Sequence, residues 1–192
     1  MNPLLHFTDV RRDYHHGDET IHALDGISLT VEAGEYTVVA GPSGSGKTTL
    51  LNLAAGLDQP TSGSVELEGV NLAVLSAAER AELRRHRIGF IFQAYNLVPV
   101  LSARENAEFV LLLQKVPAAE RRERVDAILE QVGLAGLADR RPAQLSGGQQ
   151  QRVAIARAIA NKPKVILADE ATGELDSETA REILTLLKGI AH

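Results

Sequence analysis

The sequence contains no cysteine, no long apolar run and no excess of basic residues. Without cysteine it can form neither disulfides nor thiolate metal sites. Its longest apolar runs, such as FVLLL at 109–113, are far shorter than the ~20 residues of a membrane helix. The N-terminus also lacks the apolar segment of a signal peptide. We therefore expect the chain to be soluble by itself and to act at a membrane only through a partner.

The charge balance argues against a nucleic-acid partner. The 192 residues carry a net charge of −5 and have a pI near 5.7, whereas nucleic-acid-binding domains are usually basic. The basic clusters, such as ELRRHR at 82–87, alternate with acids at the spacing expected of solvated helix faces. With 44% hydrophobic and 23% charged residues, the chain should fold around a packed core.

Strand patterns occur in two groups. Short strands separated by turns are predicted at 4–10, 27–32 and 64–69. The run at 36–40 is apolar or β-branched on consecutive positions, which predicts a strand buried on both faces of a parallel sheet. The runs IGFIF at 88–92 and KVILAD at 164–169 predict further buried strands.

Helix signals dominate the middle of the chain. Ser76 with Glu79, and Ser102 with Glu105, have the spacing of capping boxes. A further helix is predicted between Pro117 and Gly133. The segment at about 94–145 should therefore form a helical lobe outside the sheet. Strands that alternate with helices elsewhere predict an α/β fold.

Residues 41–48, GPSGSGKT, match the phosphate-loop pattern G-x-x-x-x-G-K-[ST]. A predicted strand precedes them and a predicted helix follows, which favours a phosphate loop over a chance glycine-rich turn. Lys47 would reach the β- and γ-phosphates, and Thr48 would hold Mg²⁺. The positions expected to contact the nucleotide are Gly41, Pro42, Ser43, Gly44, Ser45, Gly46, Lys47, Thr48 and Thr49.

Two carboxylates follow the apolar run at 164–168. Asp169 at such a strand end is expected to help hold Mg²⁺. Glu170 would then orient and polarise a water against the γ-phosphate. An acidic helix cap is the alternative, and the phosphate loop favours the catalytic interpretation. Because no pocket for another phosphate acceptor is recognisable, hydrolysis is favoured over kinase transfer.

A second glycine-containing loop lies at 145–152, LSGGQQQR. Ser146 and Gln149 have capping-box spacing, and the apolar residues that follow have a helical period. The loop thus leads into a helix N-terminus that could bind an anion. A plain capped helix is an equally good interpretation on these local grounds.

Together these motifs strongly resemble the ATP-binding subunit of ABC transporters. The phosphate loop, Gln93, the LSGGQ loop and ILADEATGELD at 166–176 occur in the family's order. The segment 90–113 resembles the ATPases that pair with macrolide-export and lipoprotein-release permeases. The resemblance implies a phosphate-loop NTPase core with a mostly parallel sheet, an N-terminal antiparallel β lobe and a helical lobe. It covers the chain as one ATP-binding domain, residues 1–192.

The resemblance also implies residue roles. Tyr14 would stack on adenine, Gln93 would touch Mg²⁺ and the attacking water, and Asp176 would lie in the loop that crosses a dimer interface. In the family's head-to-tail dimer, the LSGGQ loop binds the γ-phosphate of ATP held by the opposite subunit. The residues that would do so are Ser146, Gly147, Gly148 and Gln149.

The sequence departs from the family pattern in three places. Ala171 replaces a usual proline, and Glu174 replaces a frequent asparagine or alanine. The family continues past the last helix into a further strand and a histidine, and His192 is not expected to take that role. We expect a C-terminally truncated form of a parent of about 220–230 residues. Uncovered backbone edges and apolar surface should result. A degraded gene, or a strand supplied by another chain, would also explain the departure.

The function implied is ATP hydrolysis that powers a transmembrane permease from the cytoplasmic face of the membrane, as a homodimer and without nucleic acid. The alternatives are a truncated, catalytically impaired ATP-binding module and an ABC-type ATPase that acts on DNA or ribosomes. The second is disfavoured because tandem domains, coiled-coil insertions and zinc cysteines are absent from the sequence. The cofactors implied are ATP and Mg²⁺. The residues implied are Glu170, Lys47 and Gln93 for catalysis, and Thr48, Gln93 and Asp169 for the metal.

Overall fold

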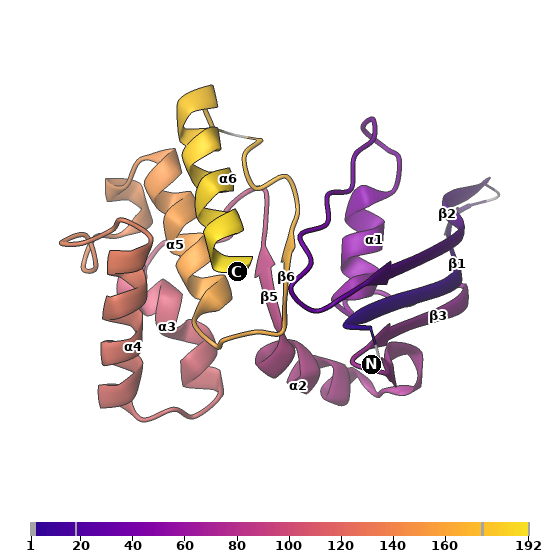
Figure 1. The fold of residues 1–192 in the computed structure, drawn as a ribbon, viewed down its shortest axis with the longest axis horizontal. Coiled ribbons are helices and arrows are strands. Elements are labelled where there is room, and N and C mark those ends of the chain that lie inside the picture. Colours follow the sequence, from indigo (N-terminus) through magenta and orange to yellow (C-terminus); the bar gives the residue numbers. More distant parts are fainter. Residues whose placement is uncertain (1–2, 18, 174, 192) are drawn as a thin grey trace. The chain divides into compact units, whose positions relative to one another are not determined.

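The computed structural model describes residues 3–17, 19–173 and 175–191, so Glu174 and His192 lie outside the described residues. The chain divides into two compact units, residues 1–84 and 85–192. Each combines helices with strands, which confirms the α/β prediction (Figure 1). None of the helices in the described ranges has both the length and the apolar composition that a bilayer crossing requires.

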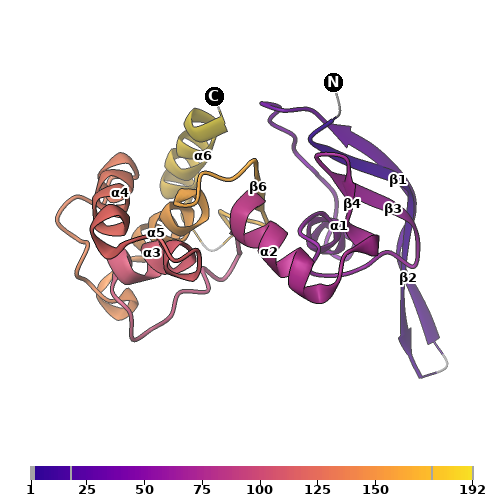
Figure 2. The same cartoon turned by 90° about the horizontal axis from the view of Figure 1, so that it is seen from below.

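The first unit is built on an antiparallel sheet with the strand order β2-β1-β3-β4. Figures 1 and 2 show β1 and β2 as a long hairpin, with β3 beside β1. Helix α1 packs against β2 and β3, and its side chains of Leu50 and Leu53 are buried. The strands predicted at 4–10, 27–32 and 64–69 are thus confirmed. The elements are β1 (Leu5–His16), β2 (Glu19–Val31), α1 (Lys47–Ala54), β3 (Ser62–Leu67), β4 (Val70–Asn71) and η1 (Leu72–Val74).

The strand predicted at 36–40 is wrong. Residues 35–42 have no regular secondary structure, and the side chain of Val38 is 71% exposed. Tyr36 and Val39 are 40% and 42% exposed. An apolar run forms a strand only where neighbouring strands pair with its backbone groups. The described strands of the first unit pair with one another and not with this segment.

The second unit holds the parallel pairing that the sequence predicted. Strands β5 (Ile88–Ile91) and β6 (Val165–Ala168) run parallel, with Ile88 opposite Val165 and Ile91 opposite Ala168. Helix α5 packs against β5 and against α3, α4 and α6 (Figures 1 and 2). Its side chains of Val153 and Ile155 are fully buried. The helices are α3 (Ala103–Leu113), α4 (Ala118–Gln131), η2 (Pro142–Gln144), α5 (Gly147–Ile159) and α6 (Ser177–Ala191), and α2 (Ala77–Arg87) spans the boundary between the units.

The predicted helix caps are confirmed. At the start of α2, the Ser76 N–H donates to Glu79 at 2.8 Å and the Glu79 N–H donates to the Ser76 hydroxyl at 3.3 Å. Ser102 and Glu105 form the same box before α3. Pro117 is the N-cap of α4, and Gly133 follows its C-cap with φ of +76°. The segment 94–145, which we expect to form a helical lobe, contains α3, α4 and η2.

Candidate functional site

The phosphate loop leads directly into α1. Gly46 is the N-cap of this helix, and no side chain among the described residues caps it. The first turn of α1 also carries no acidic residue. The first N–H groups of the helix therefore have no side-chain cap, and they lie at its positive dipole end, which suits a phosphate group.

Gly46 cannot be replaced by a larger residue in this loop. Its φ is +88°, and a Cβ atom there would lie 2.4 Å from the carbonyl oxygen of Ala23 in β2. The left-handed backbone and the close approach both require glycine. This contact seats the phosphate loop on β2.

Lys47 lies within the phosphate loop. Its Nζ donates to the carbonyl oxygens of Gly41 and Pro42, both at 3.0 Å. The ammonium group is thus held at the loop that was predicted to bind the phosphates. An anion bound in the loop would gain a charge-assisted hydrogen bond from it.

Tyr14 lies on β1 in the same unit and is 37% exposed. Its hydroxyl donates to Asp58 Oδ2 at 2.7 Å, and the guanidinium carbon of Arg12 lies 4.4 Å from the ring centroid. Burial alone would raise the pKa of Asp58, but the bonds from Tyr14 and the Gln59 N–H, with the charge of Arg12, lower it on balance. Asp58 is thus held as a carboxylate beside the tyrosine.

The acidic pair lies at the carboxyl end of the parallel strands. The Asp169 N–H donates to the carbonyl oxygen of Ile91 at 3.0 Å, which continues the β5–β6 pairing by one residue. Gln93 follows β5 at the same edge, because parallel strands end on the same side of a sheet. Three polar residues that the sequence analysis predicted for the site, Gln93, Asp169 and Glu170, therefore lie at this edge of the sheet.

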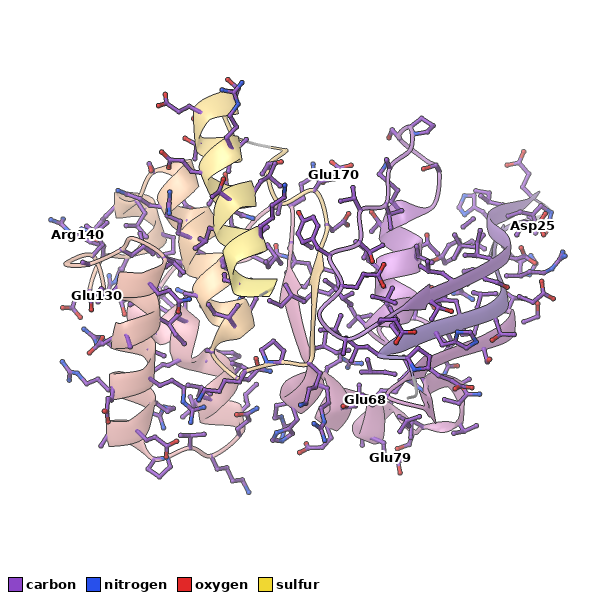
Figure 3. All side chains as sticks on the ribbon, viewed as in Figure 1. Asp25, Glu68, Glu79, Glu130, Arg140 and Glu170 are labelled. Atoms are coloured by element: carbon purple, nitrogen blue, oxygen red, sulfur yellow. The ribbon has the colours of Figure 1, made fainter. Side chains whose placement is uncertain are left out.

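Gln93 and Glu170 converge on one point. A Cβ atom placed on Gly173 would lie 3.4 Å from Gln93 Nε2 and 3.6 Å from Glu170 Oε2. Figure 3 shows Glu170 on the segment that follows β6. Its backbone has φ of +45°, a left-handed conformation that costs about 1–3 kcal/mol in a residue other than glycine. Such strain is typical of functional positions.

The second glycine-containing loop forms the start of α5. Ser146 is the N-cap and makes a full capping box with Gln149, as predicted: its N–H donates to Gln149 Oε1 at 2.9 Å, and the Gln149 N–H donates to its hydroxyl at 3.3 Å. Ser146 is itself exposed. A Cβ atom on Gly147 would lie 3.0 Å from the Tyr95 hydroxyl. The loop therefore has the capped structure and also presents a serine on the surface.

Asp176 has a structural role that the sequence reasoning missed. Its carboxylate accepts from the N–H groups of Glu178 and Thr179 at 3.0 Å and from the Thr179 hydroxyl at 2.7 Å. The Thr179 hydroxyl and N–H are the main cause of its lowered pKa. Asp176 thus caps α6, a role that the spacing D-x-x-T would have predicted.

The starts of α5 and α6 are in direct contact. A Cβ atom on Gly148 would lie 2.6 Å from Thr179 Cγ2. The Thr179 methyl group cannot turn away without breaking the bond between its hydroxyl and Asp176. The absence of a side chain at Gly148 therefore lets the two helix starts pack together.

We expect Gly148→Ala to lower the free energy of unfolding. Overpacking costs about 1–3 kcal/mol, which exceeds the helix-propensity gain of at most about 1 kcal/mol. Thr179→Ser removes the methyl group and keeps the hydroxyl, so Gly148→Ala/Thr179→Ser should regain most of the loss. Urea unfolding of both variants and of Thr179→Ser alone measures this. A double variant no more stable than Gly148→Ala would contradict the packing assignment.

Two polar side chains that the sequence analysis did not select hold the segment after Gln93. Arg157 of α5 donates to the carbonyl oxygens of Tyr95, at 2.8 Å, and Asn96, and burial lowers its pKa. Asn106 of α3, 1% exposed, accepts from the Val98 N–H at 2.7 Å. A lone arginine within the apolar run of α5 was the available signal for Arg157.

The predicted metal ligands belong to both units. Thr48 lies in the first unit, and Gln93 and Asp169 lie in the second. No three His, Cys, Asp or Glu residues gather as a possible metal site in the described ranges. Mg²⁺ is usually held by one or two carboxylates together with substrate phosphates, so the predicted set suits Mg²⁺ without such a cluster. It remains a prediction.

Comparison with known proteins identifies relatives of this arrangement. A family model described as "ABC transporter" matches residues 24–173. An uncharacterized ABC transporter ATP-binding protein from Thermotoga maritima is 49% identical over 188 residues, which are 98% of this chain and 80% of that protein. A macrolide export ATP-binding/permease protein from Brucella melitensis is 47% identical over 188 residues. That match covers 98% of this chain, so the predicted resemblance to macrolide-export ATPases is confirmed.

The solved structures agree. The ATP-binding cassette MJ0796, in a dimeric post-hydrolysis state bound to ADP and phosphate, has a TM-score of 0.91 and 43% sequence identity. The match covers 98% of this chain and 83% of that one. The chain spans only 29% of the length of the macrolide-export relative. These similarities favour a working ATPase over the impaired module that the sequence left open.

Proposed function

The chain belongs to the ABC transporter family and is an ATPase domain of it, and on that premise we propose that it hydrolyses Mg²⁺-ATP as a head-to-tail dimer to power a permease. One observation carries the proposal: α1 begins at an uncapped N-terminus, with Lys47 held in the glycine loop before it. That arrangement suits the phosphates of a nucleotide.

The chemistry assigned to this chain is attack of water on the γ-phosphorus. Glu170 accepts a proton from the water, the bond from the γ-phosphorus to the bridging oxygen breaks, and ADP and phosphate leave. Lys47 and the loop N–H groups bind the phosphate oxygens. Thr48, Gln93 and Asp169 would hold Mg²⁺, which neutralises charge on those oxygens when it is bound.

A second copy of the chain would complete each site. Ser146 and Gly148 lie at the start of α5, where N–H groups and the helix dipole favour an anion. The phosphate loop already supplies such an end for the chain's own nucleotide. We therefore assign the α5 end to the γ-phosphate of ATP on the partner subunit. The dimeric state of the MJ0796 cassette supports this assembly.

A permease is the proposed membrane partner. The macrolide-export relative is an ATP-binding/permease protein of which this chain matches 29%. Apolar side chains on α3 and the loop before it are exposed, including Val100 at 71%, Leu112 at 50% and Leu113 at 48%. Val100 follows Gln93 within about two helical turns' length of chain, and exposed apolar side chains of this kind suit a surface that a permease covers. The chain would then be cytoplasmic and peripheral on the inner face of the membrane.

Lys47→Ala tests the nucleotide site. We expect ATP to bind about 10- to 100-fold more weakly, because the variant loses charge-assisted hydrogen bonds to the phosphates. Equilibrium dialysis of ATP with Mg²⁺ measures this, and phosphate release with and without EDTA measures the dependence on Mg²⁺. Lys164→Ala, at an exposed lysine of the second unit, is the matched control and should bind normally. Equal binding by parent and Lys47→Ala would overturn the assignment of the site.

A further inference from the structure

Tyr14 is held by two charged residues that form a closed set of contacts with it. Arg12 donates to Asp58 through Nε at 2.9 Å and pairs through Nη2 at 2.8 Å. Asp58 also accepts from the Tyr14 hydroxyl at 2.7 Å. Arg12 lies over the ring at 4.4 Å from its centroid. Each of the three side chains thus touches the other two.

This arrangement leaves a restricted surface of the ring for a ligand. Arg12 covers one face, and the hydroxyl edge is bonded to Asp58. Tyr14 is nevertheless exposed, whereas the side chains of Arg12 and Asp58 are only 24% exposed. Because Arg12 covers one face, a planar group such as a nucleobase could stack only on the other face of the ring.

The same contacts join β1 to the segment after the phosphate-loop helix. The Asp58 N–H donates to the carbonyl oxygen of Asn52 in α1 at 3.3 Å. The hydrogen bond from Tyr14 to Asp58 therefore fixes the position of the ring relative to α1, the helix that follows the phosphate loop. The Tyr14 ring, which would be the platform for the base, and the phosphate loop would then already be held at a fixed distance from each other before a nucleotide binds.

We propose that Arg12 and Asp58 are positioning residues that hold Tyr14 with one face open to the nucleotide base. The inference rests on the function proposed above, in which Tyr14 stacks on adenine. Holding the ring before binding spares the nucleotide the entropy of ordering it. Arg12 suits this task better than lysine would, because its planar fork pairs with a carboxylate at two points.

The test compares two ligands, ATP and inorganic tripolyphosphate, each with Mg²⁺. Both offer phosphates to the loop, but only ATP offers a base to Tyr14. Affinities are measured by calorimetry for the 192-residue chain, Tyr14→Phe, Asp58→Ala and the double variant. Tyr14→Phe keeps the ring and removes only the hydroxyl, so it should fold normally.

We expect each single variant to bind ATP about 3- to 10-fold more weakly than the parent and to bind tripolyphosphate equally well. The double variant should lose no more than the larger single loss, because both changes remove the same hydrogen bond. Multiplied losses in the double variant would contradict the shared role.

Thr61→Val is the matched control. Its hydroxyl accepts from the Asp13 N–H at 2.9 Å, which links the same two segments without touching Tyr14. Thr61→Val should leave the ratio of ATP affinity to tripolyphosphate affinity unchanged. If it lowered that ratio as much as Asp58→Ala does, Asp58 would have only a structural role. If Tyr14→Phe and Asp58→Ala left the ratio of ATP affinity to tripolyphosphate affinity unchanged, the positioning role of Asp58 would be overturned, but the proposed function would not. A parent chain that binds neither ligand would overturn the proposed function, and the platform with it.

Discussion

Replacing Glu170 with glutamine should slow ATP hydrolysis by about 10²- to 10⁴-fold, the usual contribution of a general base. The amide has nearly the same shape as the carboxylate but cannot take a proton from water. Glu170 lies at the carboxyl edge of β5 and β6 beside Gln93, in a left-handed backbone conformation. ATP should therefore still bind, and an ATP-bound dimer should accumulate because the step that opens it is lost.

Phosphate release measures the rate of hydrolysis, and size-exclusion chromatography with ATP and Mg²⁺ measures the accumulation of the dimer. Glu130→Gln makes the same chemical change at an exposed position of α4 and should hydrolyse ATP at the parent rate. Normal hydrolysis by Glu170→Gln would show that another group takes the proton.

Local patterns predicted the helices and loops well. The box of Ser146 and Gln149 gave the start of α5, and Pro117 and Gly133 gave the limits of α4. Such signals work because the groups that cap a helix lie within four residues of the groups they satisfy. Asp176 shows the same physics, since its partners Glu178 and Thr179 are its near neighbours.

Patterns that depend on distant partners failed. The run at 36–40 has the composition of a buried strand, but a strand also needs a neighbour to pair with, and composition does not supply one. Tyr14 was selected, yet its hydroxyl partner Asp58 lies 44 residues further along the chain. Arg157 and the backbone that it holds at Asn96 are 61 residues apart. Only the folded chain brings such pairs together.

The second large effect is expected at the start of α5. Ser146→Arg should abolish ATP turnover and leave ATP binding to the monomer nearly intact. The exposed serine would be replaced by a bulky side chain where the partner subunit's γ-phosphate is proposed to sit. The chain's own phosphate loop precedes a different helix, α1, so the affinity of the monomer for ATP should be unchanged.

Loss of the α5 cap would be a competing explanation for lost turnover. A variant at a second capping serine distinguishes it from obstruction of the partner's γ-phosphate site. Ser102 caps α3 with the same box, so Ser102→Arg should lower stability by a similar amount, about 1 kcal/mol. It should nevertheless hydrolyse ATP at the parent rate, because α3 is not the proposed partner site. Urea unfolding, ATP binding and phosphate release are measured for both variants. If Ser146→Arg lost ATP binding in the monomer as fully as it lost turnover, the assignment of this loop to the partner's nucleotide would be wrong.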